Sequence, residues 1–254
     1  MIDKNAVIDS SAIIEENVEI GAFTVIGKGV TIRQGTSIGP NCYIEYADIG
    51  ANCKIYNSVS VGTPAQDLSY KGEPTKAYVG EGTILREFVT INRGTAKTSK
   101  TVVGKNCFFM VGAHAAHDTR TGDNVIMANF ASLGGHVEVG DNAFLSAFVG
   151  IHQFCKVGSN VMVGAGTIVS MDIIPYAMCC GYRAELEGLN LVGMRRRKVP
   201  AAEIENIKKA YRTLFLSKLL LADALIEIEK IDSPAVREII TFIKVSKRSL
   251  ARPK

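Results

Sequence analysis

A large aliphatic residue recurs every sixth position along most of the chain. Isoleucine occupies positions 8, 14, 20, 26, 32, 38 and 44, and after a shift of one residue the series resumes at Ile49, Ile55 and Val61. The period returns at Val79, Leu85 and Ile91, and a last series runs from Val103 to Val169. A period of six is neither the 3.6 of an amphipathic helix nor the alternation of a hairpin strand.

Of the 25 markers, 23 have Ala, Val, Thr or Cys four residues later, as at Val18, Thr24 and Cys42; the two exceptions, Asp48 and Ile173, follow the last marker of an unbroken series. Short strands joined by tight bends explain this pattern, because each strand then places one large and one small residue inside. Three such sides close a triangular coil of about 18 residues, and stacked coils pair their strands in parallel. The sequence therefore predicts an all-β parallel β-helix built of hexapeptide repeats and shaped as a triangular prism.

Two segments, residues 67–78 and 97–102, interrupt the series without changing its phase. We expect each to be a loop that leaves and rejoins the coil at the same corner, and loops on a rigid scaffold often carry function. The hexads stop near residue 190, and helical patterns follow from Pro200 onward. The expected domains are a β-helix over 1–189 with these two loops and a small α-helical domain over 190–254.

The two expected domains also differ in net charge. Residues 1–189 contain 14 Lys and Arg against 18 Asp and Glu, whereas residues 190–254 contain 15 against 7. The chain as a whole has a net charge of +4. A basic helical module on an acidic body favours an acidic partner or a phosphate-bearing ligand.

The N-terminal residues lack an apolar run, and no stretch is long and apolar enough to cross a membrane. The six cysteines form no Cys-x-x-Cys pair. We therefore expect a soluble cytoplasmic protein with free, mostly buried cysteines.

All four histidines of the chain lie between residues 114 and 152. Since residues one coil apart stack at a strand spacing of about 4.8 Å, His117, Gly135 and Gln153 form one column. Asp118, His136 and Phe154 form the next, and His114 and His152 lie beside them. We expect the imidazoles and one carboxylate to share a patch two coils tall.

Three interpretations of this patch remain open from the residues alone. In the first, a histidine acts as general base, oriented by Asp118, and bare glycines at 134 and 135 leave room for substrate and offer an N–H to an oxyanion. In the second, histidines on stacked coils bind zinc. In the third, they are structural polar groups. The chain has no serine or cysteine nucleophile signature and no phosphate-binding P-loop.

Seven strings of the chain resemble the bacterial UDP-N-acetylglucosamine acyltransferase family. They are Gln66-Asp67-Leu68, Gly72-Glu73-Pro74-Thr75, Asn92-Arg93-Gly94-Thr95, His114-Ala115-Ala116-His117-Asp118, Gly134-Gly135-His136-Val137, Ile151-His152-Gln153-Phe154-Cys155 and Gly188-Leu189-Asn190. The resemblance covers essentially the whole chain. It implies a left-handed β-helix and a homotrimer with active sites between neighbouring subunits.

The resemblance also implies a reaction. A 3-hydroxyacyl chain would move from acyl carrier protein to the glucosamine 3-position of UDP-N-acetylglucosamine, the first step of lipid A biosynthesis. His117 would be the general base, Asp118 its orienting partner and Gly135 the oxyanion donor. His114, His136, His152 and Gln153 would contact the substrates, as would Gln66, Asp67, Ser69 and Asn92. Asn190, Arg196 and Arg197 would hold the uridine diphosphate.

The chain departs from the family pattern at two of these positions. Ser69 stands where a lysine is common, and Asn92 stands where a histidine is common. Both positions are expected near the sugar or the pyrophosphate, so a 3-amino analogue of the acceptor is an alternative substrate. We also expect Ala165 to lie at the floor of the acyl groove, where side-chain size would limit chain length.

Three rival functions are weighed against this one: another hexapeptide transferase that uses acyl-CoA, a γ-class carbonic anhydrase with zinc between subunits, and a β-helix without catalysis. We expect no cofactor, no bound metal, no nucleic-acid partner and no stable membrane insertion.

Overall fold

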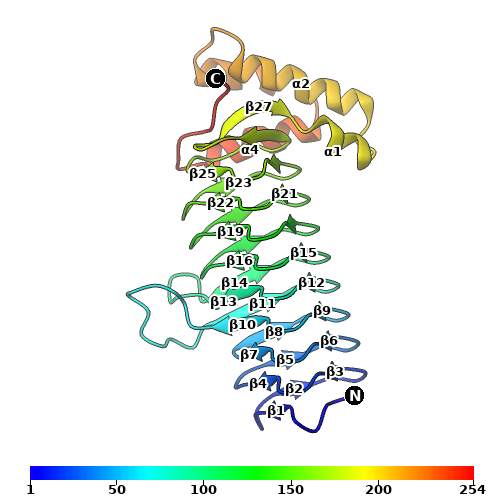
Figure 1. The fold of residues 1–254 in the computed structure, drawn as a ribbon. Coiled ribbons are helices and arrows are strands. Elements are labelled where there is room, and N and C mark those ends of the chain that lie inside the picture. Colours follow the sequence, from blue (N-terminus) through cyan, green and yellow to red (C-terminus); the bar gives the residue numbers. More distant parts are fainter.

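The computed structural model describes residues 1–254 as a triangular prism of parallel strands with helices at one end (Figure 1). The prism has three sheets, which we name in the order in which the chain visits them. Each strand pairs with the strand one coil away, usually in register over two residues, as Ile126 pairs with Phe144. The hexapeptide period therefore produces the expected β-helix.

The first sheet has nine strands: β1 (Val7–Ile8), β4 (Val25–Ile26), β7 (Tyr43–Ile44), β10 (Ser60–Thr63), β13 (Thr90–Asn92), β16 (His114–Ala115), β19 (Ser132–Leu133), β22 (Gly150–Ile151) and β25 (Ile168–Val169). The second has eight: β2 (Ile13–Ile14), β5 (Thr31–Ile32), β8 (Ala47–Ile49), β11 (Lys76–Val79), β14 (Lys100–Val103), β17 (Arg120–Thr121), β20 (Glu138–Val139) and β23 (Lys156–Val157). The third has ten: β3 (Glu19–Ile20), β6 (Ser37–Ile38), β9 (Lys54–Ile55), β12 (Ile84–Leu85), β15 (Phe108–Phe109), β18 (Ile126–Met127), β21 (Phe144–Leu145), β24 (Met162–Val163), β26 (Ala177–Cys180) and β27 (Glu185–Leu189).

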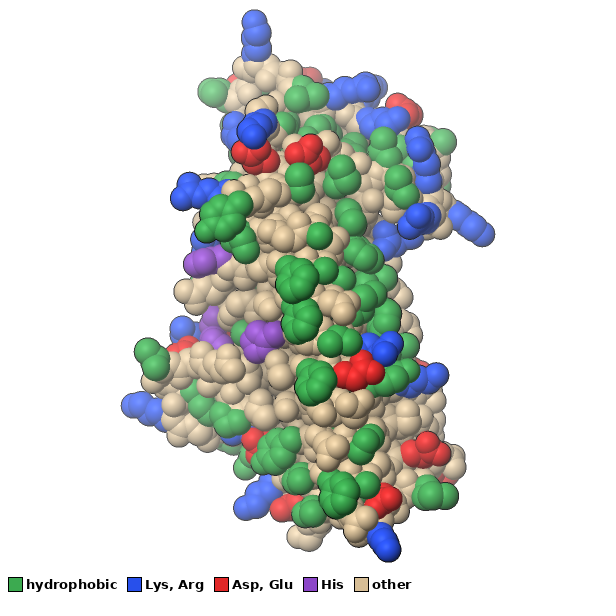
Figure 2. All heavy atoms as spheres, in the orientation of Figure 1, with side chains coloured by type: hydrophobic (Ala, Val, Ile, Leu, Met, Phe, Trp, Pro, Cys, Tyr) green, Lys and Arg blue, Asp and Glu red, His purple; other side chains and the backbone are tan.

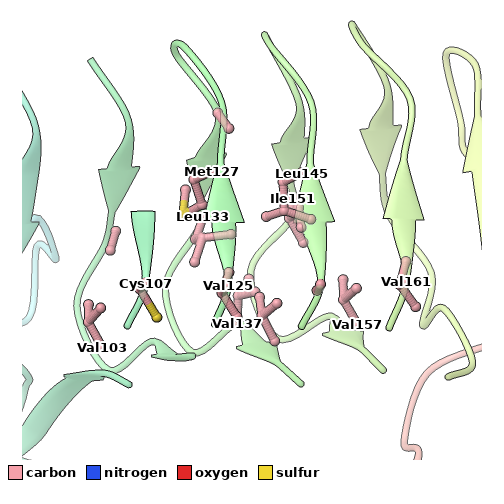
Figure 3. Packing of buried hydrophobic residues seen from close by; sticks show 14 of the residues in the cluster. Val103, Cys107, Val125, Met127, Leu133, Val137, Leu145, Ile151, Val157 and Val161 are labelled. Carbon is pink, nitrogen blue, oxygen red and sulfur yellow. The ribbon is translucent and has the colours of Figure 1, made fainter. Parts of the chain in front are cut away.

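The periodic residues fill the interior of the prism. Markers such as Met127, Leu133 and Leu145 are fully buried, and the small residues between them, such as Val125 and Val137, are buried as well. Figure 3 shows both kinds of side chain pointing inward from successive coils. One continuous apolar core therefore runs the length of the prism, and the outward positions between the markers remain free to carry a site.

The three corners of the prism differ in the residues that make the bends. The first corner joins the first sheet to the second and carries Asp118 and His136, both with positive φ. The second corner joins the second sheet to the third and carries a series of asparagines with positive φ, such as Asn142 and Asn160. The third corner returns to the first sheet. Asparagine adopts this left-handed region more readily than most residues.

Both loops leave the prism at the first corner, so they lie on the same side of the molecule (Figure 1, cyan). They begin and end earlier than the sequence suggested. Loop 1 spans residues 64–75, between β10 and β11, and loop 2 spans residues 93–99, between β13 and β14. The expected ranges ran too far because β11 and β14 each have four residues and start three residues before their marker.

The C-terminal part has four helices: α1 (Leu191–Arg196), α2 (Ala201–Phe215), α3 (Leu221–Glu229) and α4 (Pro234–Val245). The last three lie after Pro200, where the sequence predicts helical structure, and α1 begins before that point. Glu238 of α4 accepts hydrogen bonds from the hydroxyls of Ser159 and Tyr176, which ties the helices to the top of the prism. None of the four helices has the length and apolar character that crossing a bilayer requires.

Candidate active site

His117 and Asp118 form a hydrogen-bonded pair on the first corner, in the turn between β16 and β17. The distance between His117 Nδ1 and Asp118 Oδ2 is 2.7 Å, and both residues are buried. Because a carboxylate accepts the Nδ1 proton, the other ring nitrogen, Nε2, has its lone pair free. The pair therefore has the arrangement of a general base and its orienting group.

Loop 2 surrounds the carboxylate of Asp118 with donors. The backbone N–H of Thr95 donates to Oδ1 at 3.0 Å, the Thr95 hydroxyl donates to Oδ2 at 2.8 Å, and the Thr98 hydroxyl donates to Oδ1. Burial alone would raise the pKa of Asp118, but the hydrogen bonds from Thr98, His117 and Thr95 outweigh it and hold the pKa below its ordinary value. Asp118 therefore stays ionised at neutral pH.

Gly135 lies one coil above His117, against its ring. A β-carbon at this position would lie 2.6 Å from His117 Cε1 and 2.7 Å from Nε2, so only glycine leaves the ring its place. The N–H of Gly135 makes no hydrogen bond within the chain, whereas the neighbouring amides of Gly134 and His136 are paired. An unpaired amide beside the free ring nitrogen suits the stabilisation of an oxyanion.

His136 packs beside the pair, one coil above Asp118. Its ring meets the His117 ring edge-on, with centroids 5.3 Å apart, and stacks on Phe154 at 4.6 Å. Its Nε2 lies 3.6 Å from Asp118 Oδ2 and has no hydrogen-bond partner. Desolvation lowers the pKa of His136 despite the nearby carboxylate, which favours a neutral imidazole at neutral pH.

One atom from each of His117, Asp118 and His136 lies within 4.8 Å of the others, a spacing that is also compatible with a metal site. However, both oxygens of Asp118 already accept hydrogen bonds, and His117 Nδ1 is committed to one of them. Only the Nε2 atoms of His117 and His136 are without a hydrogen-bond partner. This donor set favours a base and its orienting carboxylate over a metal ligand set.

An open groove of about 560 Å³ begins at His117 and runs up the outer face of the first sheet. Its floor is the outward column His114, Ser132, Gly150 and Ile168, from β16, β19, β22 and β25. The ring of His114 is held by the Thr90 hydroxyl at 2.7 Å from Nδ1, and burial lowers the pKa of His114. The column changes from polar to apolar as it leaves His117.

Gln66 of loop 1 also lines this groove, as do His152 and Gln153, two coils above His117. His152 Nδ1 lies 3.0 Å from the carbonyl oxygen of Gln153. The stacking that the sequence predicts is present, because the His136 amide donates to the His117 carbonyl and the Phe154 amide donates to the Gly135 carbonyl.

The remaining expected residues of loop 1 and its surroundings lie near the groove without lining it. Asp67 Oδ1 accepts hydrogen bonds from both the amide and the hydroxyl of Ser69, at 2.8 and 2.7 Å. These bonds, with a smaller contribution from the charge of His117, lower the pKa of Asp67. Asn92 is buried at the base of loop 1, where its amide nitrogen donates to Thr63 Oγ1 and to the Pro64 carbonyl.

Four expected residues are not brought to His117 by this chain. Asn190 accepts a hydrogen bond from the Gly193 amide at the start of α1 and donates to the Asn160 carbonyl at the second corner. Arg197 donates to the Asn142 carbonyl at the same corner, and the exposed Arg196 is its neighbour. Ala165 is exposed in the turn between β24 and β25 and is not among the groove-lining residues, whose far end is Ile168.

Cysteine chemistry does not contribute to this site. All six cysteines are free and five are buried, as the sequence suggests. Burial raises the pKa of Cys53 and of Cys155 to about 11, so these thiols are protonated at neutral pH.

Sequence patterns assign no role to Thr90, Thr95 and Thr98, which hydrogen-bond to His114 and Asp118. Thr95 belongs to the string Asn92-Arg93-Gly94-Thr95, which resembles the family but gives no role for the threonine. Thr98 has no sequence signal, because loop 2 departs from the hexapeptide period and the spacing rule that stacks residues no longer applies.

The hexapeptide repeat and the His117–Asp118 pair are typical of one class of protein, the hexapeptide-repeat transferases. A sequence model of six hexapeptide repeats of bacterial transferases matches residues 136–170. The model described as UDP-N-acetylglucosamine O-acyltransferase, domain 2, matches residues 172–251.

Full-length relatives give the family. Acyl-[acyl-carrier-protein]–UDP-N-acetylglucosamine O-acyltransferases of Thermodesulfovibrio yellowstonii and Syntrophobacter fumaroxidans are 44% and 43% identical to this chain, and each alignment covers 99% of both sequences. The crystal structure of the UDP-N-acetylglucosamine acyltransferase from Bacteroides fragilis superposes with a TM-score of 0.97 at 40% identity, covering 99% of this chain and 100% of that one. The chain belongs to the UDP-N-acetylglucosamine O-acyltransferase family, and its fold is the left-handed parallel β-helix followed by helices.

Proposed function

We propose that this chain transfers a 3-hydroxyacyl group from acyl carrier protein to the glucosamine 3-hydroxyl of UDP-N-acetylglucosamine, the first step of lipid A biosynthesis. One observation carries the proposal for this site. The His117–Asp118 pair leaves Nε2 free beside the unpaired amide of Gly135, at the start of a groove that becomes apolar. The family relationship supplies the substrates.

In the proposed reaction, His117 Nε2 removes the proton of the sugar 3-hydroxyl while the oxygen of that hydroxyl attacks the thioester carbonyl carbon. The carbonyl oxygen becomes the oxyanion of a tetrahedral intermediate and accepts a hydrogen bond from Gly135 N–H. As the intermediate collapses, the carbon–sulfur bond breaks, and the proton held by His117 passes to the departing thiolate. Asp118 keeps the imidazole in the required tautomer and stabilises the imidazolium.

The other residues near His117 are proposed as substrate contacts. Gln66, Asp67 and Ser69 of loop 1, with Asn92 at its base, would hold the sugar or the 3-hydroxyl of the acyl chain. His114, His136, His152 and Gln153 would contact the sugar nucleotide or the acyl donor. The apolar end of the groove, at Gly150 and Ile168, would take the hydrocarbon chain.

We also propose a homotrimer, because two apolar surfaces of the prism lack a partner within one chain. The outward column of the third sheet is apolar over many coils, from Ile84 through Phe108, Ile126 and Phe144 to Met162 and Met178. The third corner, beside it, exposes Phe130 and Phe148, whose rings stack at 5.5 Å. Figure 2 shows hydrophobic side chains in a vertical band beside the histidines. Surfaces of this kind mark protein interfaces.

In such a trimer, a neighbouring subunit would supply the expected residues that a single chain does not bring to its own His117. With the third corner at a threefold axis, the third sheet of one subunit packs on the first sheet of the next. The second corner of one subunit then lies near the first corner of its neighbour, which would bring Asn190, Arg196 and Arg197 to a neighbour's His117. The planar guanidinium groups would bind the diphosphate of the nucleotide.

Mixed trimers test both the activity and the shared site. We expect His117→Ala and Arg197→Ala chains each to be inactive alone with 3-hydroxyacyl carrier protein and UDP-N-acetylglucosamine. Co-expressed, they should regain activity, because a site can combine His117 of one chain with Arg197 of the other. No recovery in mixed trimers verified by mass spectrometry would refute the shared site, and an inactive wild type would refute the function.

A second acceptor is favoured by one observation. The Asn92 side-chain oxygen is buried and has no hydrogen-bond partner in the chain. An amine offers such an acceptor more protons than a hydroxyl does, so we propose the 3-amino analogue of UDP-N-acetylglucosamine, acylated to an amide, as the alternative. Comparing kcat/KM for the two UDP-sugars decides between them.

The basic C-terminal part completes the proposal. Its excess of Lys and Arg over Asp and Glu suits the acidic carrier protein as well as a diphosphate. Because both substrates are cytoplasmic metabolites in this scheme, we propose a cytoplasmic enzyme without stable membrane insertion.

A further inference from the structure

Arg93 is a buried cation directly after β13, at the start of loop 2, with partners on three other segments. Its Nη1 lies 3.2 Å from Glu45 Oε1 and donates to the Gly62 carbonyl at 3.1 Å, and its Nε donates to the Tyr70 hydroxyl at 2.7 Å. The guanidinium also lies over the Tyr46 ring, 4.4 Å from its centroid. An arginine this well surrounded is fixed in place and can fix its neighbours.

Tyr70 is the contact of Arg93 in the middle of loop 1. Its hydroxyl accepts from Arg93 and donates to the Glu73 carbonyl at 3.1 Å, and its ring lies 5.6 Å from the guanidinium carbon of Arg93. Its amide donates to the Asp67 carbonyl at 3.0 Å, so Tyr70 and Asp67 belong to one turn. A second tie, from the Thr75 hydroxyl to the Gly94 carbonyl, closes the end of the loop.

The other end of this turn faces the groove. Gln66 lines the groove together with His117, and Asp67 is close enough to His117 for the imidazole to influence its carboxyl group. No other side-chain hydrogen bond joins residues 65–70 to the prism, because Asp67 and Ser69 bond to each other. The position of Gln66 and Asp67 relative to His117 therefore depends on Arg93 and Tyr70.

We propose that Arg93 is a positioning residue for the acceptor subsite: through Tyr70 it holds loop 1 where Gln66 and Asp67 can contact substrate. Arg93 touches neither His117 nor Asp118. Its loss should therefore weaken binding of the substrate held by loop 1 and leave the chemical step nearly unchanged. This inference rests on the proposed function for the substrate, but the loop contact itself is independent of it.

Tyr70→Phe is the mildest test, because it removes only the hydroxyl that joins the two residues. We expect the KM for the UDP-sugar to rise about tenfold, the effect of losing one charge-assisted hydrogen bond, with kcat within about twofold of the wild type. Arg93→Lys should act in the same direction. Combined with Arg93→Lys, Tyr70→Phe should add little, since both remove one interaction.

Limited trypsinolysis gives a readout without catalysis. Lys71 is exposed in loop 1, next to Tyr70, and its amide donates to Glu73 Oε2. Cleavage after Lys71, followed by mass spectrometry, should be about tenfold faster in both variants, because local opening is easier without the contact. The control is Tyr78→Phe, on the outer face of β11, where the hydroxyl has no hydrogen bond in the chain.

These experiments distinguish failure of the loop contact from failure of the proposed function. Faster cleavage together with a raised KM in Tyr70→Phe, and neither change in Tyr78→Phe, supports the proposal. Unchanged cleavage, or an unchanged KM with a lowered kcat, overturns it. If the wild type lacks acyl transfer altogether, the proposed function fails, and the cleavage rates still decide whether Arg93 and Tyr70 hold the loop.

Discussion

His117 Nδ1 lies 2.7 Å from Asp118 Oδ2 although the two residues are consecutive in the chain. Consecutive side chains point apart in a strand. Here the backbone of Asp118 has φ of 61°, in the left-handed region, and the turn folds its carboxylate back toward the preceding ring. The bend with positive φ that lets the prism turn its corner thus also forms the His117–Asp118 hydrogen bond.

Removing the imidazole should remove the reaction and spare the fold. We expect His117→Ala to lower kcat by about 10³-fold, the typical contribution of a general base with its electrostatic partner. The thermal midpoint should stay within a few degrees of the wild type, because the prism core does not include this ring. Acyl transfer is measured with 3-hydroxyacyl carrier protein, and folding by circular dichroism. A variant that kept most of its rate would contradict the assignment of the base.

Asp118 should stabilise the protein only where it is ionised. Its pKa is lower in the folded chain, so the stabilisation is present above the unfolded pKa of about 4 and is lost as the pH falls through the folded value. We therefore expect Asp118→Asn to melt at a lower temperature than the wild type at pH 7. The difference should shrink toward zero at acidic pH values below the folded pKa, where the wild-type group is protonated and resembles an amide. A difference that did not change between these pH values would contradict the prediction.

Much of this fold could be predicted from the sequence, because each hexapeptide places one large and one small residue inside the prism. Since every coil stacks on the next, this pattern has to be kept along the whole prism and is therefore visible in the sequence. The same regularity predicts Asp118, His136 and Phe154 in one column, and the structure confirms it, with His136 beside Asp118 and stacked on Phe154. The regularity could not place residues that leave the repeat. The start of β11 at Lys76 and the hydroxyl of Thr98 depend on contacts between loops, which no period encodes.

Two arginines at the end of α1 show a second limit of prediction from the sequence. Arg196 and Arg197 were expected at the site from resemblance, and the single chain places Arg197 at the second corner, against Asn142. No sequence pattern indicates which corner of one subunit contacts which corner of its neighbour. Within one chain, the exposed rings of Phe130 and Phe148 and the apolar column of the third sheet indicate where a neighbour would lie.

Thr98 should control catalysis without touching substrate. Its hydroxyl donates to Asp118 Oδ1 from loop 2, so Thr98→Val leaves one lone pair of the carboxylate unsatisfied at constant side-chain volume. We expect kcat/KM to fall about tenfold, as for a lost hydrogen bond to a charged group. Thr98→Ser keeps the hydroxyl and should restore most of the activity. Equal activities of the Val and Ser variants would show that the hydroxyl is not needed.

Gly135→Ala should inactivate the enzyme by displacing the base. The new β-carbon would lie 2.6 Å from His117 Cε1, closer than non-bonded carbon atoms approach, and the ring has to move. A displacement of about 1 Å at a catalytic group typically lowers kcat about 10²-fold. Steady-state kinetics with saturating substrates measures this effect, and the thermal midpoint checks that the turn is intact. If kcat stayed at the wild-type value, His117 would not need its present position.

The column of the first sheet should set the length of acyl chain that the groove accepts. A β-carbon on Gly150 points into open groove except for Ile168 Cδ1 at 3.2 Å, so Gly150→Val fills the middle of the groove. We expect this variant to prefer shorter acyl chains than the wild type, and Ile168→Ala to accept longer ones. A series of 3-hydroxyacyl carrier proteins that differ in chain length measures both shifts as ratios of kcat/KM. Ala165→Gly belongs in the same series, because Ala165 lies outside the groove of a single chain and reaches the acyl chain only if a neighbouring subunit closes the end near Ile168. A shifted preference in Ala165→Gly would therefore support a groove that continues into the turn after β24, whereas an unchanged one would leave Ile168 as its end and refute the role expected for Ala165.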